Sequence, residues 1–134
     1  MKGHHKLEVW KRSIDLVTRI YNMTSTFPKE EIYGLSSQIR RASVAIPSNI
    51  AEGAGRKSNK EFIQFLSIAQ GSIAELETQI IISRNLGYIK DVDGLLSELD
   101  EISKMMIGLQ KSLKSVTSDE YKCLVTRNSS LVTN

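Results

Sequence analysis

The sequence has 134 residues, of which 40% are hydrophobic, 25% charged and 6% aromatic, as in a single globular domain with an aliphatic core. It contains no apolar run of about 18 residues and no charged-then-apolar leader, which argues against a membrane span or a secretory signal. The single cysteine, Cys123, can form no internal disulfide, in keeping with a reducing compartment. We therefore expect a single-domain cytoplasmic protein.

The formal net charge of +3 is unevenly distributed along the chain. Residues 1–60 carry 11 Lys and Arg against 5 Asp and Glu, whereas residues 61–134 carry 7 against 10. A basic half can attract a phosphate backbone, but a solvated surface or a complementary subunit contact also explains such asymmetry and is commoner. Charge alone leaves these explanations open.

The first predicted helix covers residues 7–26. Its apolar residues recur at spacings of three and four, which places them in one stripe that we expect to face the core. A second apolar row on the same helix then needs burial elsewhere, as in a subunit contact. The expected core stripe comprises Leu7, Trp10, Ile14, Val17 and Tyr21, and the second row comprises Leu16, Ile20 and Met23.

The second predicted helix covers residues 29–52 and ends before Gly53-Ala54-Gly55. Pro28 suits the start of a helix, and the charges of Glu30 and Glu31 favour the first turn because of the helix dipole. The core stripe of this helix comprises Leu35, Ile39, Ala42, Ile46 and Asn49.

The third and fourth predicted helices cover residues 59–86 and 92–117. Ser58-Asn59-Lys60-Glu61 is a capping box, in which the serine hydroxyl accepts a hydrogen bond from an otherwise unpaired amide. Residues 119–134 are rich in Ser, Thr and Asn, and we expect a loosely ordered tail there. The third stripe comprises Phe62, Leu66, Ala69, Ile73, Leu76, Ile80 and Ser83, and the fourth comprises Leu99, Ile102, Met106, Leu109, Leu113 and Val116.

Two features of the third helix are not explained by its core stripe. Gly71 interrupts the helix at a cost of about 1 kcal/mol relative to alanine. We expect another helix, from the same chain or a neighbouring subunit, to approach closely there. The consecutive isoleucines at residues 80–82 point to different sides of the helix, so at least one of them leaves the core.

Four stripes separated by short connections predict an all-α fold. We expect residues 1–118 to form an up-down-up-down, left-handed four-helix bundle. The surplus apolar rows predict that copies of this bundle associate with one another.

The stretch IRRASVAIPSNIAEGAGR, residues 39–56, carries polar residues and a proline within a helical pattern. Asn49 either satisfies neighbouring backbone and fixes the register of the bundle, or contacts a ligand or subunit at a kink caused by Pro47. The adjacent Arg40 and Arg41 suit planar, bidentate partners, which are carboxylates across a subunit boundary or phosphates.

Arg56, Lys57 and Lys60 cluster at the turn after the second helix. Exposed amides at the start of the third helix also favour anions there. This turn is therefore a stronger phosphate-binding candidate than the pair Arg40 and Arg41, although a solvated basic turn explains it equally well.

The sequence offers no catalytic, cofactor-binding or metal-binding constellation. Its only histidines, His4 and His5, lie together near the N-terminus, so no carboxylate-and-histidine metal site can form on core helices. No glycine-rich phosphate loop is present. We therefore expect a protein without enzymatic activity.

The run QIRRASVAIPSNIAEGAGRKSNKEF, residues 38–62, resembles the signature of the four-helix-bundle proteins encoded in intervening sequences of bacterial 23S ribosomal RNA genes. The likeness extends over residues 4–116, and the fourth helix matches only in its hydrophobic pattern. The further matching segments are LEVWKRSIDLV (7–17, with Trp10), FPKEEIYGL (27–35) and FLSIAQGSIAELETQI (65–80).

The resemblance implies an up-down bundle that assembles into a cyclic homo-oligomer, a pentameric ring. Related accessory proteins of diversity-generating retroelements resemble the same bundle, and they engage nucleic acid and a reverse transcriptase as basic oligomers. We therefore expect a non-enzymatic accessory or scaffold protein that binds RNA or DNA backbone. The alternative is a protein-interaction ring without a nucleic-acid role. The candidate nucleic-acid-binding residues are Arg56, Lys57, Lys60, Arg40 and Arg41, and the candidate structural or interface residues are Asn49, Pro47, Gly71 and Trp10.

Overall fold

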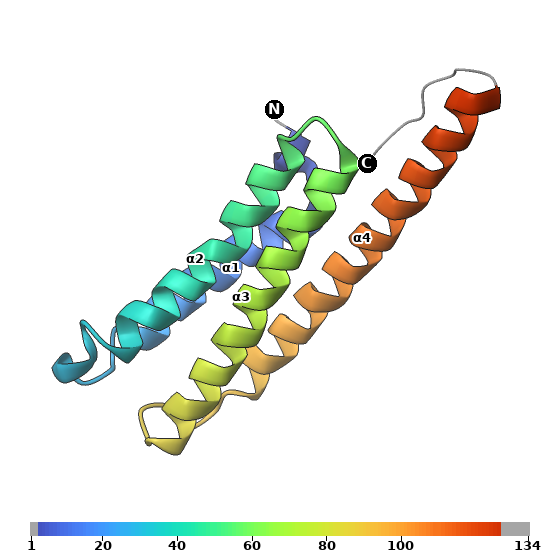
Figure 1. Cartoon of the computed structure of the whole chain (residues 1–134). Coiled ribbons are helices and arrows are strands. Elements are labelled where there is room, and N and C mark those ends of the chain that lie inside the picture. Colours follow the sequence, from blue (N-terminus) through green and yellow to red (C-terminus); the bar gives the residue numbers. More distant parts are fainter. Residues whose placement is uncertain (1–2, 127–134) are drawn as a thin grey trace.

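The computed structural model describes residues 3–126, without the side chains of residues 5, 6 and 116–126, and within that range it is all-α. Its four helices alternate in direction along the bundle (Figure 1). They are α1 (Glu8–Thr24), α2 (Leu35–Ala54), α3 (Asn59–Asn85) and α4 (Asp93–Thr126), with short 3-10 turns η1 (Gly3–Lys6) and η2 (Lys29–Glu31).

The helices pack in a ring in which each contacts the next along the chain and α4 returns to α1. The contact between α2 and α3 is the most extensive, and that between α1 and α4 is the least. An ion pair crosses this weakest contact, with Arg12 Nη2 2.6 Å from Glu98 Oε1. The four-helix, strand-free fold predicted from the sequence is confirmed for the described residues.

The core is built mainly from aliphatic side chains on all four helices. The expected stripe of α3 is buried throughout, from Phe62 to Ser83. In α2 the stripe is shifted at its C-terminal end, because Ile50 is fully buried and Asn49 lies at the edge of the core. The fully buried large side chains are Leu16, Ile20, Ile39, Ile46, Ile50, Leu66, Leu76, Ile80, Leu99, Ile102, Met106 and Leu113.

The expected orientation of α1 is wrong. Leu16 and Ile20, assigned to the outer row, are completely buried, whereas Ile14 and Tyr21, assigned to the core, are 39% and 42% exposed. Both rows have helical spacing, so the sequence pattern alone does not distinguish which one faces the bundle. The surplus apolar surface of α1 is therefore the row that contains Trp10 and Ile14.

α2 begins at Leu35, six residues later than expected, because Glu31 defines its N-terminus. The Leu35 N–H donates to Glu31 Oε1 at 3.0 Å, and the Tyr88 hydroxyl donates to Glu31 Oε2 at 2.8 Å. A Cβ at Gly34 would lie 2.8 Å from Glu31 Oε1, so the glycine leaves room for this carboxylate. Residues 29–34 consequently form a connection that Tyr88 holds against the connection between α3 and α4.

Within the described chain, helices approach closely at Gly53 and not at Gly71, and an approach to Gly71 by a neighbouring subunit stays a prediction. A Cβ at Gly53 would lie 2.8 Å from both Phe62 Cδ1 and Phe65 Cβ, so the end of α2 packs directly against the first turns of α3. A Cβ at Gly71 would meet nothing within 4 Å, so none of the described helices approaches it closely.

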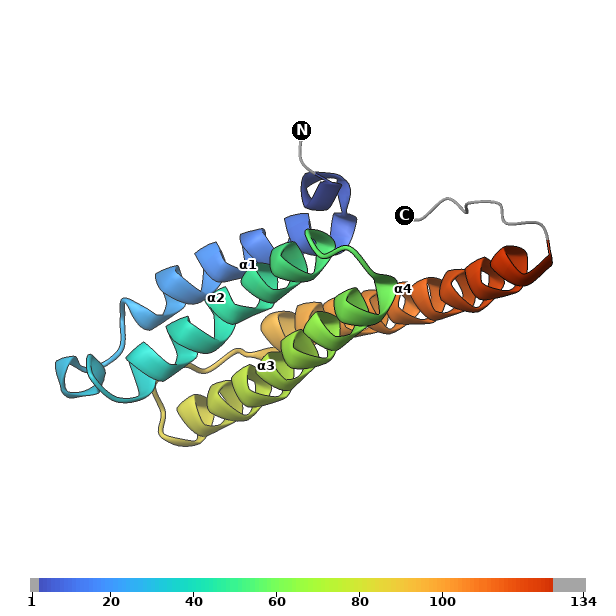
Figure 2. The ribbon, with the colours of Figure 1, turned by 45° about the horizontal axis from the view of Figure 1, so that its top comes forward.

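α4 is longer than expected. It continues through Thr126 into the stretch assigned to a loosely ordered tail, while residues 127–134 lie outside the described part of the chain. Figure 2 shows α4 extending past the α2–α3 turn. None of the described helices is long and apolar enough to cross a membrane.

Gly53→Ala should lower the free energy of unfolding by about 1–3 kcal/mol, because the added methyl group overpacks the contact with Phe62 and Phe65. Urea denaturation measures the change. Gly71→Ala is the matched control, and it should be neutral or stabilising by up to about 1 kcal/mol through helix propensity. Equal stability of the two variants would contradict the close packing at Gly53.

Glu31→Gln should destabilise the protein at neutral pH. The pKa of Glu31 is lowered, first by the Leu35 N–H and second by the Tyr88 hydroxyl, so the folded state favours the ionised carboxylate. This stabilisation is complete above the ordinary glutamate pKa of about 4.3 and is lost as the pH falls through the lower folded-state value. The melting-temperature difference between Glu31→Gln and wild type should therefore shrink below about pH 4.

Glu30→Gln is the control for that measurement, since Glu30 is an exposed neighbour whose side chain forms no hydrogen bond. It should melt like wild type at neutral pH. Tyr88→Phe removes one of the two donors to Glu31 and should give an intermediate loss of stability. A melting-temperature difference for Glu31→Gln that stays constant with pH would contradict the role of the ionised carboxylate.

Candidate functional site

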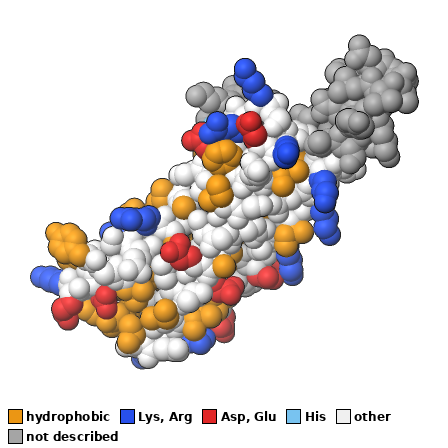
Figure 3. All heavy atoms as spheres, viewed as in Figure 1, with side chains coloured by type: hydrophobic (Ala, Val, Ile, Leu, Met, Phe, Trp, Pro, Cys, Tyr) orange, Lys and Arg blue, Asp and Glu red, His pale blue; other side chains and the backbone are white. Residues whose placement is uncertain are grey.

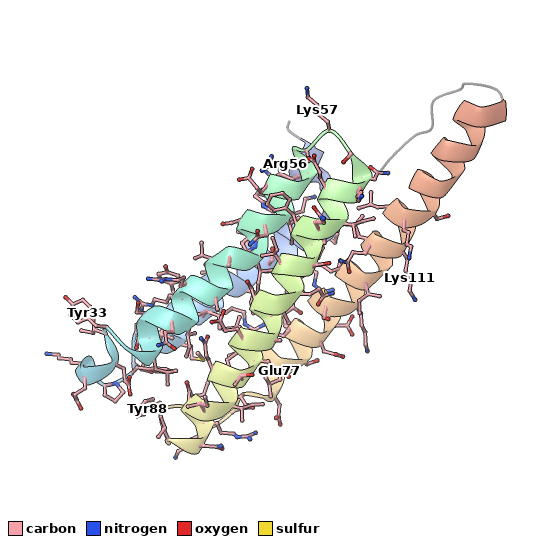
Figure 4. All side chains as sticks on the ribbon, viewed as in Figure 1. Tyr33, Arg56, Lys57, Glu77, Tyr88 and Lys111 are labelled. Carbon is pink, nitrogen blue, oxygen red and sulfur yellow. The ribbon has the colours of Figure 1, made fainter. Side chains whose placement is uncertain are left out.

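The turn between α2 and α3 presents Arg56, Lys57 and Lys60 at one end of the bundle (Figure 4). The predicted cap is present, with Ser58 Oγ accepting a hydrogen bond from the Glu61 N–H at 3.2 Å. Asn59 Nδ2 donates to the Leu113 carbonyl at 3.4 Å and so ties the turn to α4. The turn is therefore anchored at both sides, while its cations remain at the surface.

The three cations of this turn differ in how they are held. Arg56 Nη2 lies 3.3 Å from Glu52 Oε2, and its guanidinium lies 4.7 Å from the centre of the Phe65 ring. Such an exposed pair contributes little to stability but orients the side chain. Lys57 and Lys60 are exposed and form no ion pair in the described part of the chain.

α4 carries two further exposed lysines, and Figure 4 shows that Lys111 lies part-way along α4, away from Arg56 and Lys57. Lys111 and Lys114 are exposed on either side of Leu113, whose carbonyl contacts the turn. Figure 3 shows Lys and Arg side chains at the end of the bundle with the α2–α3 turn, with Asp and Glu side chains beside some of them, and charges of both signs over the rest of the visible face. We call Arg56, Lys57 and Lys60 the basic end. Two lysines three residues apart are common on helices, so this spacing could not have identified Lys111 and Lys114 from the sequence.

Arg40 and Arg41 do not join the basic end. Arg40 Nε donates to Thr24 Oγ1 at 2.7 Å, its Nη2 donates to the Tyr21 carbonyl at 3.3 Å, and its guanidinium lies 4.5 Å from the centre of the Tyr21 ring. Arg41 is exposed on the next position of α2. The five predicted cations thus fall into two separate groups, and Arg40 links α2 to the C-terminal turn of α1.

The candidate interface residues Trp10 and Pro47 line a shallow groove between α1 and α2. This apolar groove has a volume of about 320 Å³. Asn49 follows Ser48, which lines the groove, but its Nδ2 donates to the Ala45 carbonyl at 2.8 Å. This bond to neighbouring backbone is the one expected under the first of the two alternatives for Asn49. The apolar groove is lined by His4, Trp10, Ile14, Val17, Val44, Pro47, Ser48 and Ala51.

The described residues contain no group of three or more His, Cys, Asp and Glu side chains that could hold a metal ion. The shifted pKa values belong to residues in structural contacts. The pKa of Arg12 is raised chiefly by its hydrogen bond to Glu98, and that of Tyr88 by its hydrogen bond to Glu31. These groups hold helices together, so their pKa shifts have a structural explanation.

The comparison with known proteins agrees with this arrangement of elements. The family model for the 23S rRNA-intervening sequence protein matches residues 5–108, which include α1, α2, α3 and the first half of α4. A search of curated proteins finds no significant match. Because the family model covers most of the chain, the protein belongs to the 23S rRNA-intervening sequence protein family.

Proposed function

We propose that the protein is a non-enzymatic, oligomeric bundle that binds RNA or DNA backbone through the basic end and acts as an accessory or scaffold protein. The observation that carries this proposal is the set of exposed cations on the α2–α3 turn, of which Lys57 and Lys60 form no ion pair in the described part of the chain. Lysine and arginine side chains without a base-reading motif suit phosphates rather than particular sequences. Two carboxylates, Glu52 and Glu61, lie nearby, and Glu52 is paired with Arg56.

The exposed apolar row of α1 supports self-association. Ile14 and Val44 are each 39% exposed and face the apolar groove, whose lining is largely hydrophobic. Covering such a surface with another copy removes apolar area from water and stabilises an assembly. In a pentameric ring the basic end would recur once per subunit, so weak phosphate contacts would combine through avidity.

The alternative function is a protein-interaction ring without a nucleic-acid role. The apolar groove favours this alternative, since it provides a contact surface that requires no phosphate. A partner enzyme that acts on nucleic acid, such as a reverse transcriptase, would be compatible with either function. The two functions differ in whether reversing the charge of the basic end affects binding.

Wild-type protein should bind single-stranded RNA and DNA with little sequence preference, and each lost phosphate contact should reduce the log–log salt slope by about 0.7. Changing Arg56, Lys57 and Lys60 together to Glu should weaken binding and flatten that slope, while helicity and assembly mass stay unchanged. Fluorescence anisotropy over a salt series measures the effect.

The matched control reverses Arg19, Arg84 and Lys90, which are exposed cations outside the basic end. Both variants have the same net charge, so only a local role of the basic end predicts different affinities. Equal weakening by the two variants, or no binding by wild-type protein at low salt, would favour the interaction ring.

The solution mass should exceed the 15.0 kDa of one chain several-fold, as light scattering after size exclusion would show. Ile14→Glu combined with Val44→Glu should reduce this mass, because buried unpaired charges oppose association at the apolar groove. Thr18→Glu combined with Gln38→Glu places the same two charges at exposed positions of α1 and α2 outside the groove and should leave the mass unchanged. A wild-type monomer at micromolar concentration would contradict self-association.

A further inference from the structure

A pocket of about 450 Å³ lies where the C-terminal turn of α1, the α1–α2 connection and the first turns of α2 meet. It is separate from the basic end, because the α1–α2 connection and the α2–α3 turn lie at opposite ends of α2. Figure 4 shows this separation through Tyr33, which belongs to the connection, and Lys57, which belongs to the turn.

The charges that line this pocket are all positive. Lys29, Arg40 and Arg41 contribute three cations, and no Asp or Glu is among the lining residues. The nearby Glu31 carboxylate is engaged by the Leu35 N–H and the Tyr88 hydroxyl and does not line the pocket. Arg40 is held by two neutral oxygens, those of Thr24 and Tyr21, so its charge has no anionic partner in the described part of the chain.

Two hydroxyl groups in the first turn of α2 also line the pocket without a partner. The Ser36 residue is only 6% exposed, and its hydroxyl forms no hydrogen bond in the described part of the chain, so this oxygen is available to a ligand in the pocket. Ser37 lines the pocket beside it, and its hydroxyl also forms no hydrogen bond. The backbone N–H groups of both serines precede the first intrahelical bonds of α2 and have no protein acceptor.

This combination of groups selects an anion with several acceptor oxygens. A phosphate accepts bonds from guanidinium groups, hydroxyls and helix N-terminal amides, all of which the pocket offers. The remaining wall is apolar and partly aromatic, with Tyr21, Phe27 and Ile32. The volume of about 450 Å³ is within the range of small-molecule sites and exceeds what a bare phosphate needs.

We propose that this pocket binds the phosphate of a nucleotide-sized ligand, with Arg40, Arg41 and Lys29 as counter-charges and Ser36 and Ser37 as neutral donors. The apolar wall then contacts the organic part of the ligand. The same chemistry is presented by a free nucleotide and by a phosphorylated end of a nucleic-acid strand. The proposal does not depend on backbone binding at the basic end.

The test titrates the full-length protein at low salt by calorimetry with inorganic phosphate, AMP and adenosine. AMP should bind more tightly than phosphate, and adenosine should bind at least about ten-fold more weakly than AMP, because a charged hydrogen-bonding group is lost. Two further arms use a short single strand with and without a 5′-phosphate. Tighter binding of AMP than of the phosphorylated strand would identify a free nucleotide as the ligand, and the reverse order would identify a strand end. Either result supports phosphate binding in the pocket.

The pocket variants avoid Arg40, since that side chain also links α1 to α2. Arg41→Gln combined with Lys29→Gln should weaken AMP binding by about ten-fold or more. Ser36→Ala should weaken it roughly three- to ten-fold without loss of stability, because the hydroxyl has no partner in the protein. Arg84→Gln combined with Lys90→Gln is the charge-matched control and should bind like wild type.

Binding of AMP should survive charge reversal at Arg56, Lys57 and Lys60, which separates this proposal from the function assigned to the basic end. The proposal is overturned if AMP and phosphate fail to bind at low salt, or if AMP and adenosine bind equally. It is also overturned if the Arg41 and Lys29 double variant leaves AMP affinity unchanged but reduces assembly mass, since the pocket would then receive a carboxylate from a neighbouring copy.

Discussion

The close packing of α3 against the end of α2 at Gly53 is the contact on which the arrangement of this bundle depends. Phe62 and Phe65 occupy the space that any side chain at residue 53 would need. Because α2 and α3 meet so closely, the chain reverses over a few residues, and Arg56 and Lys57 are presented at the very end of the bundle (Figure 4). The guanidinium of Arg56 also stacks on the Phe65 ring, so the same residue contacts the end of α2 and orients the charge of Arg56.

A second constraint arises because α1 carries two apolar rows and a bundle can bury only one of them. Leu16 and Ile20 enter the core completely, which leaves the row with Trp10 and Ile14 on the surface. That row joins Val44 and Pro47 of α2 in the apolar groove. The same packing choice that completes the core therefore creates the surface that we propose to be covered in an assembly.

Positive charge occupies two separate places and is held in different ways. At the basic end, lysines are solvated and suited to weak contacts that add together. At the α1–α2 connection, Arg40 is fixed by Thr24 and the Tyr21 ring, and Ser36, which lines the same pocket, has no hydrogen-bond partner for its hydroxyl. The first arrangement suits an extended polyanion, and the second suits one phosphate with a defined position.

Local sequence determined the helices, their caps and most of the core, because apolar spacing and capping boxes act within a few residues. The α3 stripe and the bond from Ser58 to Glu61 are examples. The α2–α3 turn with its cations Arg56, Lys57 and Lys60 was likewise predictable from local sequence, whereas the α1–α2 connection was not, because Tyr88 helps to hold it. Only the tertiary structure decided which row of α1 is buried, that helices of this chain pack closely at Gly53 and not at Gly71, and that Arg40 and Arg41 lie apart from the basic end. These outcomes depend on contacts between helices, such as Gly53 with Phe62 and Arg40 with Thr24, and helical periodicity contains no information about them.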